Sequence, residues 1–375
     1  MKDTILFGDC KETLSAFLPQ SARTCVTSPP YYGLRDYGTA TWIGGDPNCK
    51  HRKVGKQGSN CITGHKNHDD MGSVGDYIFK SVCPLCGAIR QDSQIGLEES
   101  PEEYVESLVS VFREVRNILT DDGTLWVNLG DSYYNYRPGK GQSYPKQSVS
   151  KTKQDLPDEC NKRGNKLDGL KEKDLIGIPW LFAFAMRKDG WYLRQDIIWH
   201  KPNPMPESVR DRCTKSHEYI FLFSKNRKYF YDNEAIKEPA KDWGTRDRTN
   251  GKYHNTGTGL APHSGLSKSY ATKNKRSVWS VTVKPYKEAH FATYPPDLIE
   301  LCINAVSEEG DTILDPFMGA GTTAAVAKSL NRYYIGCELN EDYGNLIERR
   351  IQDYQPVNKV AQEPCINIGY YIIEE

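Results

Sequence analysis

The tetrapeptide Ser28-Pro29-Pro30-Tyr31 is the first part of the sequence whose residue types suggest chemistry. It follows an apolar, β-type run at residues 24–27, and two consecutive prolines end a strand ladder and stiffen the backbone. The carbonyl groups of Ser28 and Pro29 then remain available as acceptors beside the ring of Tyr31. Rigid acceptors next to an aromatic plate suit an amino group on a flat heterocycle. A proline turn with a packing tyrosine is the alternative interpretation.

A glycine-rich segment near the other end of the chain has the composition of a ligand-binding turn. Residues 315–323, Asp-Pro-Phe-Met-Gly-Ala-Gly-Thr-Thr, lie between a short apolar strand and a helix, where glycines let a ligand approach the helix N-terminus. Glu338, at the end of the next strand, can accept hydrogen bonds from two ribose hydroxyl groups. The pattern alone fits a nucleoside cofactor, NAD, or a turn without a ligand. Only one β–α unit follows it, which disfavours NAD because a dinucleotide needs a second mononucleotide-binding half.

A third group of residues has the spacing of a metal site. Cys83-Pro-Leu-Cys86-Gly87 is a zinc-knuckle pattern, with two thiolates on a tight turn that a glycine closes. Cys49 and His51 lie upstream and complete a tetrahedral set of three sulfur ligands and one nitrogen ligand. Three further residues compete for the second pair of places: Cys61, His65 and His68. Reduced thiols on a loop are the alternative.

The whole chain has the composition of a globular protein, with 375 residues of which 38% are hydrophobic and 26% charged. This excludes a fully disordered chain, a coiled coil and a collagen-like fibre. The longest apolar run, residues 178–186, is too short for a membrane span, and no signal-peptide pattern is visible, so we expect a cytoplasmic protein without a membrane partner. Eleven cysteines, an odd number, argue against a disulfide framework in such a protein.

Charge is balanced overall but unevenly distributed. The chain has 49 basic and 49 acidic residues, yet residues 201–276 contain 16 basic and 8 acidic residues. A neutral protein with one basic stretch is typical of a localised polyanion contact. A solvated surface would have the same composition.

Strands and helices alternate at both ends of the chain, which predicts an α/β protein with a mostly parallel sheet. A helix over residues 100–119 begins with Ser100 as its N-cap and a proline at its first position. An Asp-Asp-Gly turn at residues 121–123 is expected to precede a strand over residues 124–129. Other expected strands cover residues 4–7, 24–27, 191–199, 219–224, 312–314 and 333–336, and other expected helices cover residues 11–18, 178–188, 295–306, 322–330 and 342–354.

In chain order these motifs resemble those of the DNA amino-methyltransferases, which transfer a methyl group from S-adenosylmethionine to cytosine N4 or adenine N6. Residues 28–31 resemble the catalytic motif and residues 315–323 the cofactor loop, and this order resembles the circularly permuted β group. The resemblance covers about two thirds of the chain. Five further segments resemble family motifs in the same order: Phe7–Asp9, Asp196–Pro204, Glu218–Phe223, His290–Pro295 and Tyr334–Glu338.

The resemblance implies a role for each motif. The tetrapeptide 28–31 would be catalytic. Asp9 would lie in the segment that contacts the adenine of S-adenosylmethionine, Glu338 would bind the ribose, and Phe291 and Pro295 would close over the methionine part. The other expected cofactor-binding residues belong to the glycine-rich segment: Asp315, Phe317, Gly319, Gly321, Thr322 and Thr323. A structural zinc ion bound to Cys49, His51, Cys83 and Cys86 is expected in addition.

The expected fold is a Rossmann-like methyltransferase fold with permuted motif order and a small zinc-binding insert. The insert is inferred because residues 38–97 have little apolar periodicity and no core of their own. The expected division is residues 1–37 and 98–237 for the catalytic part, 38–97 for the zinc-knuckle module, 238–285 for a basic target-recognition segment, 286–355 for the cofactor-binding part and 356–375 for a C-terminal tail.

Ser28 is the residue that best discriminates between the two target bases. In the family that the chain resembles, Asp or Asn at this position goes mostly with adenine, and Ser more often with cytosine N4. A serine hydroxyl can donate to the cytosine ring nitrogen or accept from the amine, whereas a carboxylate only accepts. We therefore expect methylation of cytosine N4, with adenine N6 as the alternative.

Three other classes of protein remain open at this stage. They are a non-enzymatic zinc-containing nucleic-acid-binding protein, an NAD-dependent oxidoreductase, and a methyltransferase that acts on RNA or on a protein amide. The first leaves the glycine-rich segment and the tetrapeptide without a role. Double-stranded DNA is the expected partner, and the resemblance leaves room for a cognate restriction endonuclease. The oligomeric state and the recognition sequence have no signal in the sequence.

Overall fold

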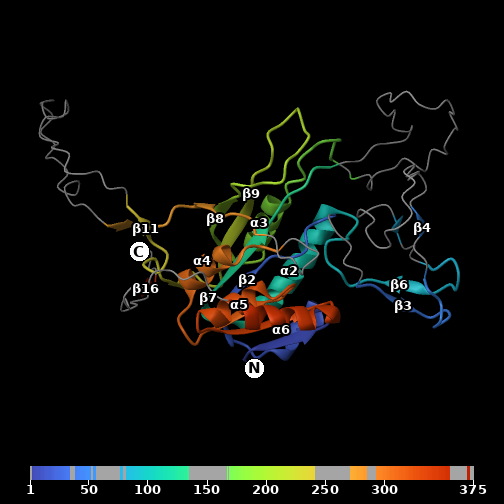
Figure 1. Cartoon of the computed structure of the whole chain (residues 1–375), viewed down its shortest axis with the longest axis horizontal. Coiled ribbons are helices and arrows are strands. Elements are labelled where there is room, and N and C mark those ends of the chain that lie inside the picture. The colour runs from blue at the N-terminus through green and yellow to red at the C-terminus, as the bar shows by residue number, and fades with distance from the viewer. Residues whose placement is uncertain are drawn as a thin grey trace, which may run out of the picture.

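The computed structural model is built around one large mixed sheet with helices on both faces (Figure 1). It describes residues 2–33, 39–51, 82–134, 167, 169–240, 271–284 and 293–354, and the backbone of the short strands at residues 54–55, 77–78 and 370–371. Phe291 and residues 241–270, most of the expected basic segment, lie outside the described residues, as does the expected tail except residues 370–371. None of the described helices is long and apolar enough to cross a bilayer.

The large sheet has eight strands in the order β1-β15-β14-β2-β7-β9-β8-β13. β9 is antiparallel to its neighbours β7 and β8, and the other neighbouring pairs are parallel, so the expected mostly parallel α/β sheet is confirmed. The strand bounds are β1 Thr4–Phe7, β15 Tyr333–Glu338, β14 Thr312–Asp315, β2 Ala22–Thr27, β7 Leu119–Leu129, β9 His217–Ser224, β8 Tyr192–His200 and β13 Val278–Ser280.

Two apolar clusters cover the two faces of this sheet. Along β7, Leu125 and Val127 belong to one cluster and Trp126 to the other, because successive side chains of a strand point to opposite faces. The first cluster takes in α1 (Cys10–Thr13), α2 (Pro101–Ile118) and α3 (Ile178–Lys188). The second takes in α4 (Pro296–Val306), α5 (Thr322–Ser329) and α6 (Gly344–Asp353).

The N-terminus of α2 forms as the sequence predicts. Ser100 is its N-cap, and the Ser100 hydroxyl accepts a hydrogen bond from the Glu103 amide at 3.2 Å. The expected turn at residues 121–123 is wrong, since these residues lie within β7. They occupy an irregularity of the ladder, where residues 119 and 124 of β7 pair with residues 22 and 24 of β2. The Asp-Asp-Gly sequence therefore marks a bulge in this strand.

Several short strand pairs lie outside the large sheet. β3 (Thr41–Ile43) pairs antiparallel with β6 (Ile89–Gln91), and Figure 1 shows this pair at one end of the molecule, beside β4 (Val54–Gly55). The remaining short strands are β5 Tyr77–Ile78, β10 Phe230–Tyr231, β11 Glu238–Pro239, β12 Thr272–Lys273 and β16 Tyr370–Tyr371.

The expected helix at residues 11–18 is shorter than predicted, since α1 ends at residue 13 and a 3-10 turn follows.

Candidate active site

A cavity of about 390 Å³ lies at the carboxyl ends of the parallel strands β1, β2, β7 and β15. This is the edge at which open α/β sheets bind ligands. All four residues of the tetrapeptide 28–31 line it, and part of the glycine-rich segment faces them. The cofactor-binding residues of the sequence analysis that reach this cavity are Asp9, Phe317, Gly319, Thr322 and Glu338.

The tetrapeptide begins where a strand ladder ends. The pairing of β2 with β7 stops at Thr27, so the backbone from Ser28 onward turns into the cavity. The Tyr104 hydroxyl, from the buried face of α2, donates to the Pro30 carbonyl at 2.8 Å. The helix therefore fixes the position of the second proline.

The side chain of Tyr31 is held by two polar residues from neighbouring strands. Its hydroxyl donates to Glu218 Oε2 at 2.6 Å and accepts from Asn128 Nδ2 at 2.7 Å. Burial, and then the nearby Glu218 carboxylate, raise the pKa of Tyr31 well above its usual value. The phenol therefore stays protonated and remains a donor to Glu218.

The sequence analysis did not name Asn128, and it placed Glu218 and Lys201 in family-like segments without giving either residue a role. Asn128 Nδ2 lies 2.9 Å from Glu218 Oε2 and 3.4 Å from Ser28 Oγ, and the Lys201 ammonium forms an ion pair with the Glu218 carboxylate. All three side chains line the cavity. A polar residue at the end of the apolar run of β7 was the one available signal for Asn128.

Gly130 makes room for the ring of Tyr31. A Cβ atom at position 130 would lie 2.5 Å from Tyr31 Cε2 and 2.9 Å from Tyr31 Cδ2, far inside van der Waals contact. The ring of Tyr31 thus packs flat against backbone that lacks a side chain. The sequence analysis did not identify this requirement, because it depends on contact between two separate strands.

The glycine-rich segment is tied to Glu338 on the next strand. The Gly319 amide donates to Glu338 Oε2 at 2.7 Å, and the Asn340 amide donates to Glu338 Oε1 at 2.9 Å. Burial raises the pKa of Glu338 to about 7 despite these two donors. Gly321 has a left-handed φ of +78°, and a Cβ there would lie 2.9 Å from Ile347 Cγ2, so only glycine fits.

Asp315 lies behind the cavity wall. It is fully buried, and its carboxylate accepts hydrogen bonds from the Thr27 hydroxyl at 2.6 Å, the Thr323 hydroxyl at 2.6 Å and the Phe317 amide at 3.0 Å. Tyr294, which belongs to the family-like segment His290–Pro295, lines the cavity and donates to Asp315 at 3.0 Å. The carboxylate therefore joins β2, β14 and α5 behind the site.

Three more of the expected cofactor-binding residues are not part of the cavity lining. Thr323 is buried beside Asp315, and Gly321 precedes α5 as its N-cap. Pro295 is buried at the N-cap of α4, next to Tyr294. Phe291 lies outside the described residues.

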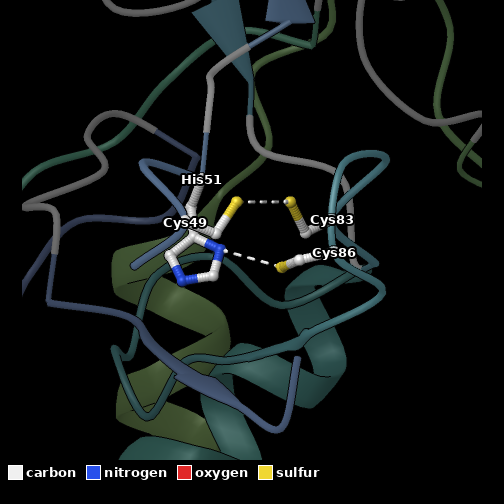
Figure 2. Close-up of side chains that lie close together, drawn as sticks. All are labelled: Cys49, His51, Cys83 and Cys86. Atoms are coloured by element: carbon white, nitrogen blue, oxygen red, sulfur yellow. Dashed lines mark hydrogen bonds between the residues drawn. The ribbon is translucent and has the colours of Figure 1, made fainter. Parts of the chain in front are cut away.

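The four expected metal ligands come together. Their ligand atoms all lie within 4.8 Å of one another, with Cys49 Sγ 3.9 Å from Cys83 Sγ and Cys86 Sγ 3.6 Å from His51 Nδ1 (Figure 2). A tetrahedral zinc ion with bonds of about 2.3 Å to sulfur and about 2.0 Å to nitrogen would separate two sulfur atoms by about 3.8 Å and a sulfur from a nitrogen by about 3.5 Å. The donor set and its spacing therefore fit zinc. The competing residues lie outside the described part of the chain: Cys61, His65 and His68.

Comparison with known proteins identifies the family. A family model described as DNA methylase matches residues 22–349, which include the tetrapeptide, the glycine-rich segment and Glu338. The chain belongs to the DNA methylase family. The resemblance to the DNA amino-methyltransferases is thus confirmed, and this DNA methylase is an enzyme that methylates DNA.

Individual relatives of this DNA methylase agree with the family model. The chain is 39% identical to the Type II methyltransferase M.SmaI of Serratia marcescens, over 92% of this chain and 90% of that protein. It is 38% identical to the Type II methyltransferase M.XycI of Xanthomonas campestris pv. cyanopsidis, over 93% and 87%. Among solved structures, the PvuII DNA methyltransferase (cytosine-N4-specific) aligns with a TM-score of 0.54 at 15% identity, over 95% of this chain and 89% of that one.

The structural likeness establishes that this DNA methylase has the α/β fold of methyltransferases. The family assignment decides against an NAD-dependent oxidoreductase and against a non-enzymatic nucleic-acid-binding protein. It also places the cavity in an enzyme whose substrate is DNA.

Proposed function

We propose that this DNA methylase transfers the methyl group of S-adenosylmethionine to the N4 amine of a cytosine flipped out of double-stranded DNA. The observation that carries the proposal is the shared cavity, in which the tetrapeptide 28–31 and the glycine-rich segment 315–323 meet. One segment offers a base-sized aromatic site and the other a nucleoside-sized turn beside an acidic residue. Transfer between two such ligands needs them to be adjacent.

The base is bound by the tetrapeptide. The Ser28 hydroxyl and the Pro29 carbonyl accept hydrogen bonds from the two N–H groups of the exocyclic amine, while the base stacks on Tyr31. Flipping is required because the amine of a stacked, paired base cannot reach the carboxyl edge of the sheet. Asn128 and Glu218 support the stacking ring through its hydroxyl group, at 2.7 and 2.6 Å.

The chemistry of the transfer follows from these contacts. An exocyclic amine is a poor nucleophile because its lone pair is delocalised into the ring. Acceptors at Ser28 and Pro29 favour a pyramidal nitrogen with a localised lone pair, and the rigid proline backbone fixes its direction. When bound, S-adenosylmethionine supplies a methyl carbon on a positively charged sulfur. The new N–C bond replaces the S–C bond, the amine loses one proton to its acceptors and then to water, and no cysteine nucleophile is needed.

The opposite end of the cavity is assigned to S-adenosylmethionine. Each Glu338 oxygen receives one backbone donor, at 2.7 and 2.9 Å, which leaves lone pairs for the ribose hydroxyl groups. Asp9, which follows β1 and lines the cavity, is assigned to the adenine. Phe291 and Pro295 are assigned to the methionine part on the sequence resemblance, and their neighbour Tyr294 lines the cavity. Asp315 supports the loop from behind.

Cytosine is assigned as the target because the tetrapeptide begins with serine. The Ser28 hydroxyl can donate to the cytosine ring nitrogen, and it lies 3.4 Å from Asn128 Nδ2, a second neutral group. Within the resemblance described above, serine at this position goes more often with cytosine N4. Adenine N6 is the alternative, since adenine also presents an amine beside a ring nitrogen.

The four metal ligands are assigned to a structural zinc ion. Three sulfur atoms and one nitrogen atom close the coordination sphere, so the site leaves no position for a substrate. This assignment accompanies the proposed division of the chain, in which residues 38–97 form a zinc-knuckle module inserted into the catalytic part. The proposed permuted order rests on the sequence positions of the two motifs, since residues 28–31 precede residues 315–323.

Double-stranded DNA is assigned to the surface around the opening of the cavity. The basic residues 238–285 are assigned to recognition of the target sequence. The Type II names of the relatives M.SmaI and M.XycI support a place in a restriction-modification system, with a cognate endonuclease as a separate protein. A cytoplasmic location follows from this role.

Transfer of a radiolabelled methyl group to DNA tests the proposal directly. The purified chain is incubated with labelled S-adenosylmethionine and an unmethylated duplex of mixed sequence, and label retained on the DNA is counted. Wild-type protein should label the duplex, and Ser28→Ala should lose most of the rate while binding the cofactor normally. Equal labelling by wild type and Ser28→Ala would reject the role of the tetrapeptide.

A further inference from the structure

The zinc-knuckle module contacts the catalytic tetrapeptide. We propose that the bound zinc ion fixes residues 93–96 as a wall of the base-binding end of the cavity and thereby positions Tyr31. The ion would position the tetrapeptide for methyl transfer as well as stabilise the insert. This inference rests on the proposed zinc site and on the proposed base-binding role of residues 28–31.

The path from the metal ligands to the cavity is short. The Cys83 amide donates to the Ala88 carbonyl at 2.8 Å, and the Gly87 amide donates to the Cys83 carbonyl at 2.9 Å, so the knuckle leads directly into β6. β6 ends at Gln91, and residues 93–95 immediately after it line the cavity. Few residues therefore separate Cys86 from the wall.

The other pair of ligands is joined to the same ladder. β3, which pairs with β6, leads through residues 44–48 to Cys49, and the ring of Trp42 stacks on the His51 ring at 4.4 Å and 8°. A Cβ at position 45 would lie 2.8 Å from both Cys86 Sγ and Ala88 Cβ, which shows how closely the two arms pack. Zinc would cross-link both arms at the end of the β3–β6 pair.

The far end of the wall touches the tetrapeptide. Ile95 is buried in the apolar cluster that contains α2, and the Gly96 carbonyl accepts a hydrogen bond from the Gly33 amide at 2.8 Å. Gly96 has a φ of +103°, and a Cβ there would lie 3.0 Å from the Tyr31 carbonyl. The wall therefore holds the backbone from the Tyr31 carbonyl to Gly33.

Zinc matters for this wall because the strand pairs described in the module are only two or three residues long. A two-stranded ribbon with strands of three residues is marginally stable in water. Metal ligands that are apart in the unfolded chain couple binding to folding, so the ion orders both arms. Glu338 and Gly319, by contrast, are carried by the large sheet. Loss of zinc should therefore loosen the base end of the cavity and leave the cofactor end intact.

The test uses the full-length protein with and without zinc. Elemental analysis of protein prepared without chelator should find about one zinc per chain, and chelation or the double change Cys83→Ser and Cys86→Ser should remove it. Hydrogen exchange of the Gly33 amide, read without any substrate, should then speed up at least about tenfold. The rate of methyl transfer should fall at least about tenfold, while cofactor affinity should stay within about twofold. Added zinc should restore the transfer rate of the chelated protein.

Two glycine variants separate positioning from general stability. Gly96→Ala should retain zinc and cofactor binding but slow methyl transfer, because its Cβ would press on the Tyr31 carbonyl. Gly44→Ala is the matched control, since Gly44 has a φ of +72° with no atom within 4 Å of the added Cβ. Slower transfer in Gly96→Ala alone supports the inference, and equal rates in the two variants overturn it.

The remaining outcomes are equally decisive. If the protein prepared without chelator contains no zinc, the inference is wrong. It is also wrong if removal of zinc leaves the exchange rate of the Gly33 amide unchanged. If removal of zinc also abolishes cofactor binding, the inference is wrong, because the ion would then stabilise the whole fold. If zinc-replete protein transfers no methyl group to DNA, the proposed function fails, while the exchange measurement still decides whether zinc orders the tetrapeptide.

Discussion

The Tyr31 hydroxyl lies 2.6 Å from Glu218 Oε2 and donates to it, which links the tetrapeptide 28–31 to the start of the antiparallel strand β9. The same carboxylate pairs with the Lys201 ammonium, from the segment after β8. A charged, largely buried pair thus holds a neutral phenol at the cavity edge. The orientation of the aromatic plate depends on this contact as well as on the two prolines.

Tyr31→Phe should slow methyl transfer while leaving the cofactor site unchanged. The variant keeps the ring but leaves the Glu218 carboxylate and Asn128 Nδ2 without their shared partner. A hydrogen bond to a charged group contributes about 1.5–3 kcal/mol, which corresponds to a fall in kcat of roughly 10- to 150-fold. Steady-state kinetics with DNA and calorimetry with S-adenosylmethionine measure the two effects.

Tyr229→Phe is the control for this change. Tyr229 is buried near Arg194, with its hydroxyl 3.3 Å from Arg194 Nε, and it is not part of the cavity lining. Its kcat should match that of the wild type. An equal loss in both variants would mean that the effect of Tyr31→Phe comes from general stability.

Gly130→Ala should displace the ring of Tyr31, because the added Cβ would lie 2.5 Å from Tyr31 Cε2. We expect the rate of methyl transfer to fall at least about tenfold, because a displacement of about 1 Å in a group that positions the substrate costs that much or more. Gly344→Ala is the control, as its Cβ would meet Phe7 Cζ at an ordinary 3.4 Å. Full activity of Gly130→Ala in a single-turnover assay would show that the ring position is not critical.

Glu338→Ala should weaken S-adenosylmethionine binding by about 1.5–3 kcal/mol, the contribution of a charged hydrogen bond. The pKa of the Glu338 carboxyl is raised to about 7, so the group is protonated below that pH and loses acceptor capacity for the ribose. Wild-type affinity should therefore fall as the pH drops through about 7. Calorimetry should find no such step in Glu338→Ala, and a step of the same size in both proteins would assign it to another group.

Asp315→Ala should lower the stability of the fold. The change removes the acceptor of the buried Thr27 hydroxyl and of the Phe317 amide, while the Thr323 hydroxyl keeps the Val26 carbonyl at 3.3 Å. A buried group without a partner costs about 1–3 kcal/mol. We expect a loss of at least about 2 kcal/mol in the free energy of unfolding, measured by urea titration. The exposed Glu348 on α6 provides a control, since Glu348→Ala should change stability by no more than about 0.5 kcal/mol. Equal midpoints for the two variants would contradict the supporting role of Asp315.

Much of the site could be predicted from the sequence because of one geometric rule. The tetrapeptide and Glu338 both follow strands of a parallel sheet, and the carboxyl ends of parallel strands meet at one edge. The ligand set of Cys49, His51, Cys83 and Cys86 followed from spacing, and the fold brings its ligand atoms within 4.8 Å of one another. Local patterns of this kind need no knowledge of strand register.

Other features depend on register or side-chain direction, which short patterns do not encode. Asn128 meets Glu218 because antiparallel β9 lies beside β7, with Leu129 paired to Tyr219. Asp315 ends a strand of four residues, and sequence alone does not tell whether its side chain faces the cavity or the layer behind it. The Asp-Asp-Gly bulge in β7 likewise has the composition of a turn, and its place in the strand depends on pairing with β2 at either end and on the Lys225 amide, which donates to the Gly123 carbonyl at 3.1 Å.

The identity of the methylated nucleoside tests the central claim most directly. Unmethylated DNA of mixed sequence is incubated with the wild-type chain and S-adenosylmethionine, digested to nucleosides and analysed by mass spectrometry against authentic standards. Ser28 at the head of the tetrapeptide predicts N4-methyldeoxycytidine, absent when Ser28→Ala replaces the wild type. N6-methyldeoxyadenosine as the sole modified nucleoside would contradict the assignment of cytosine.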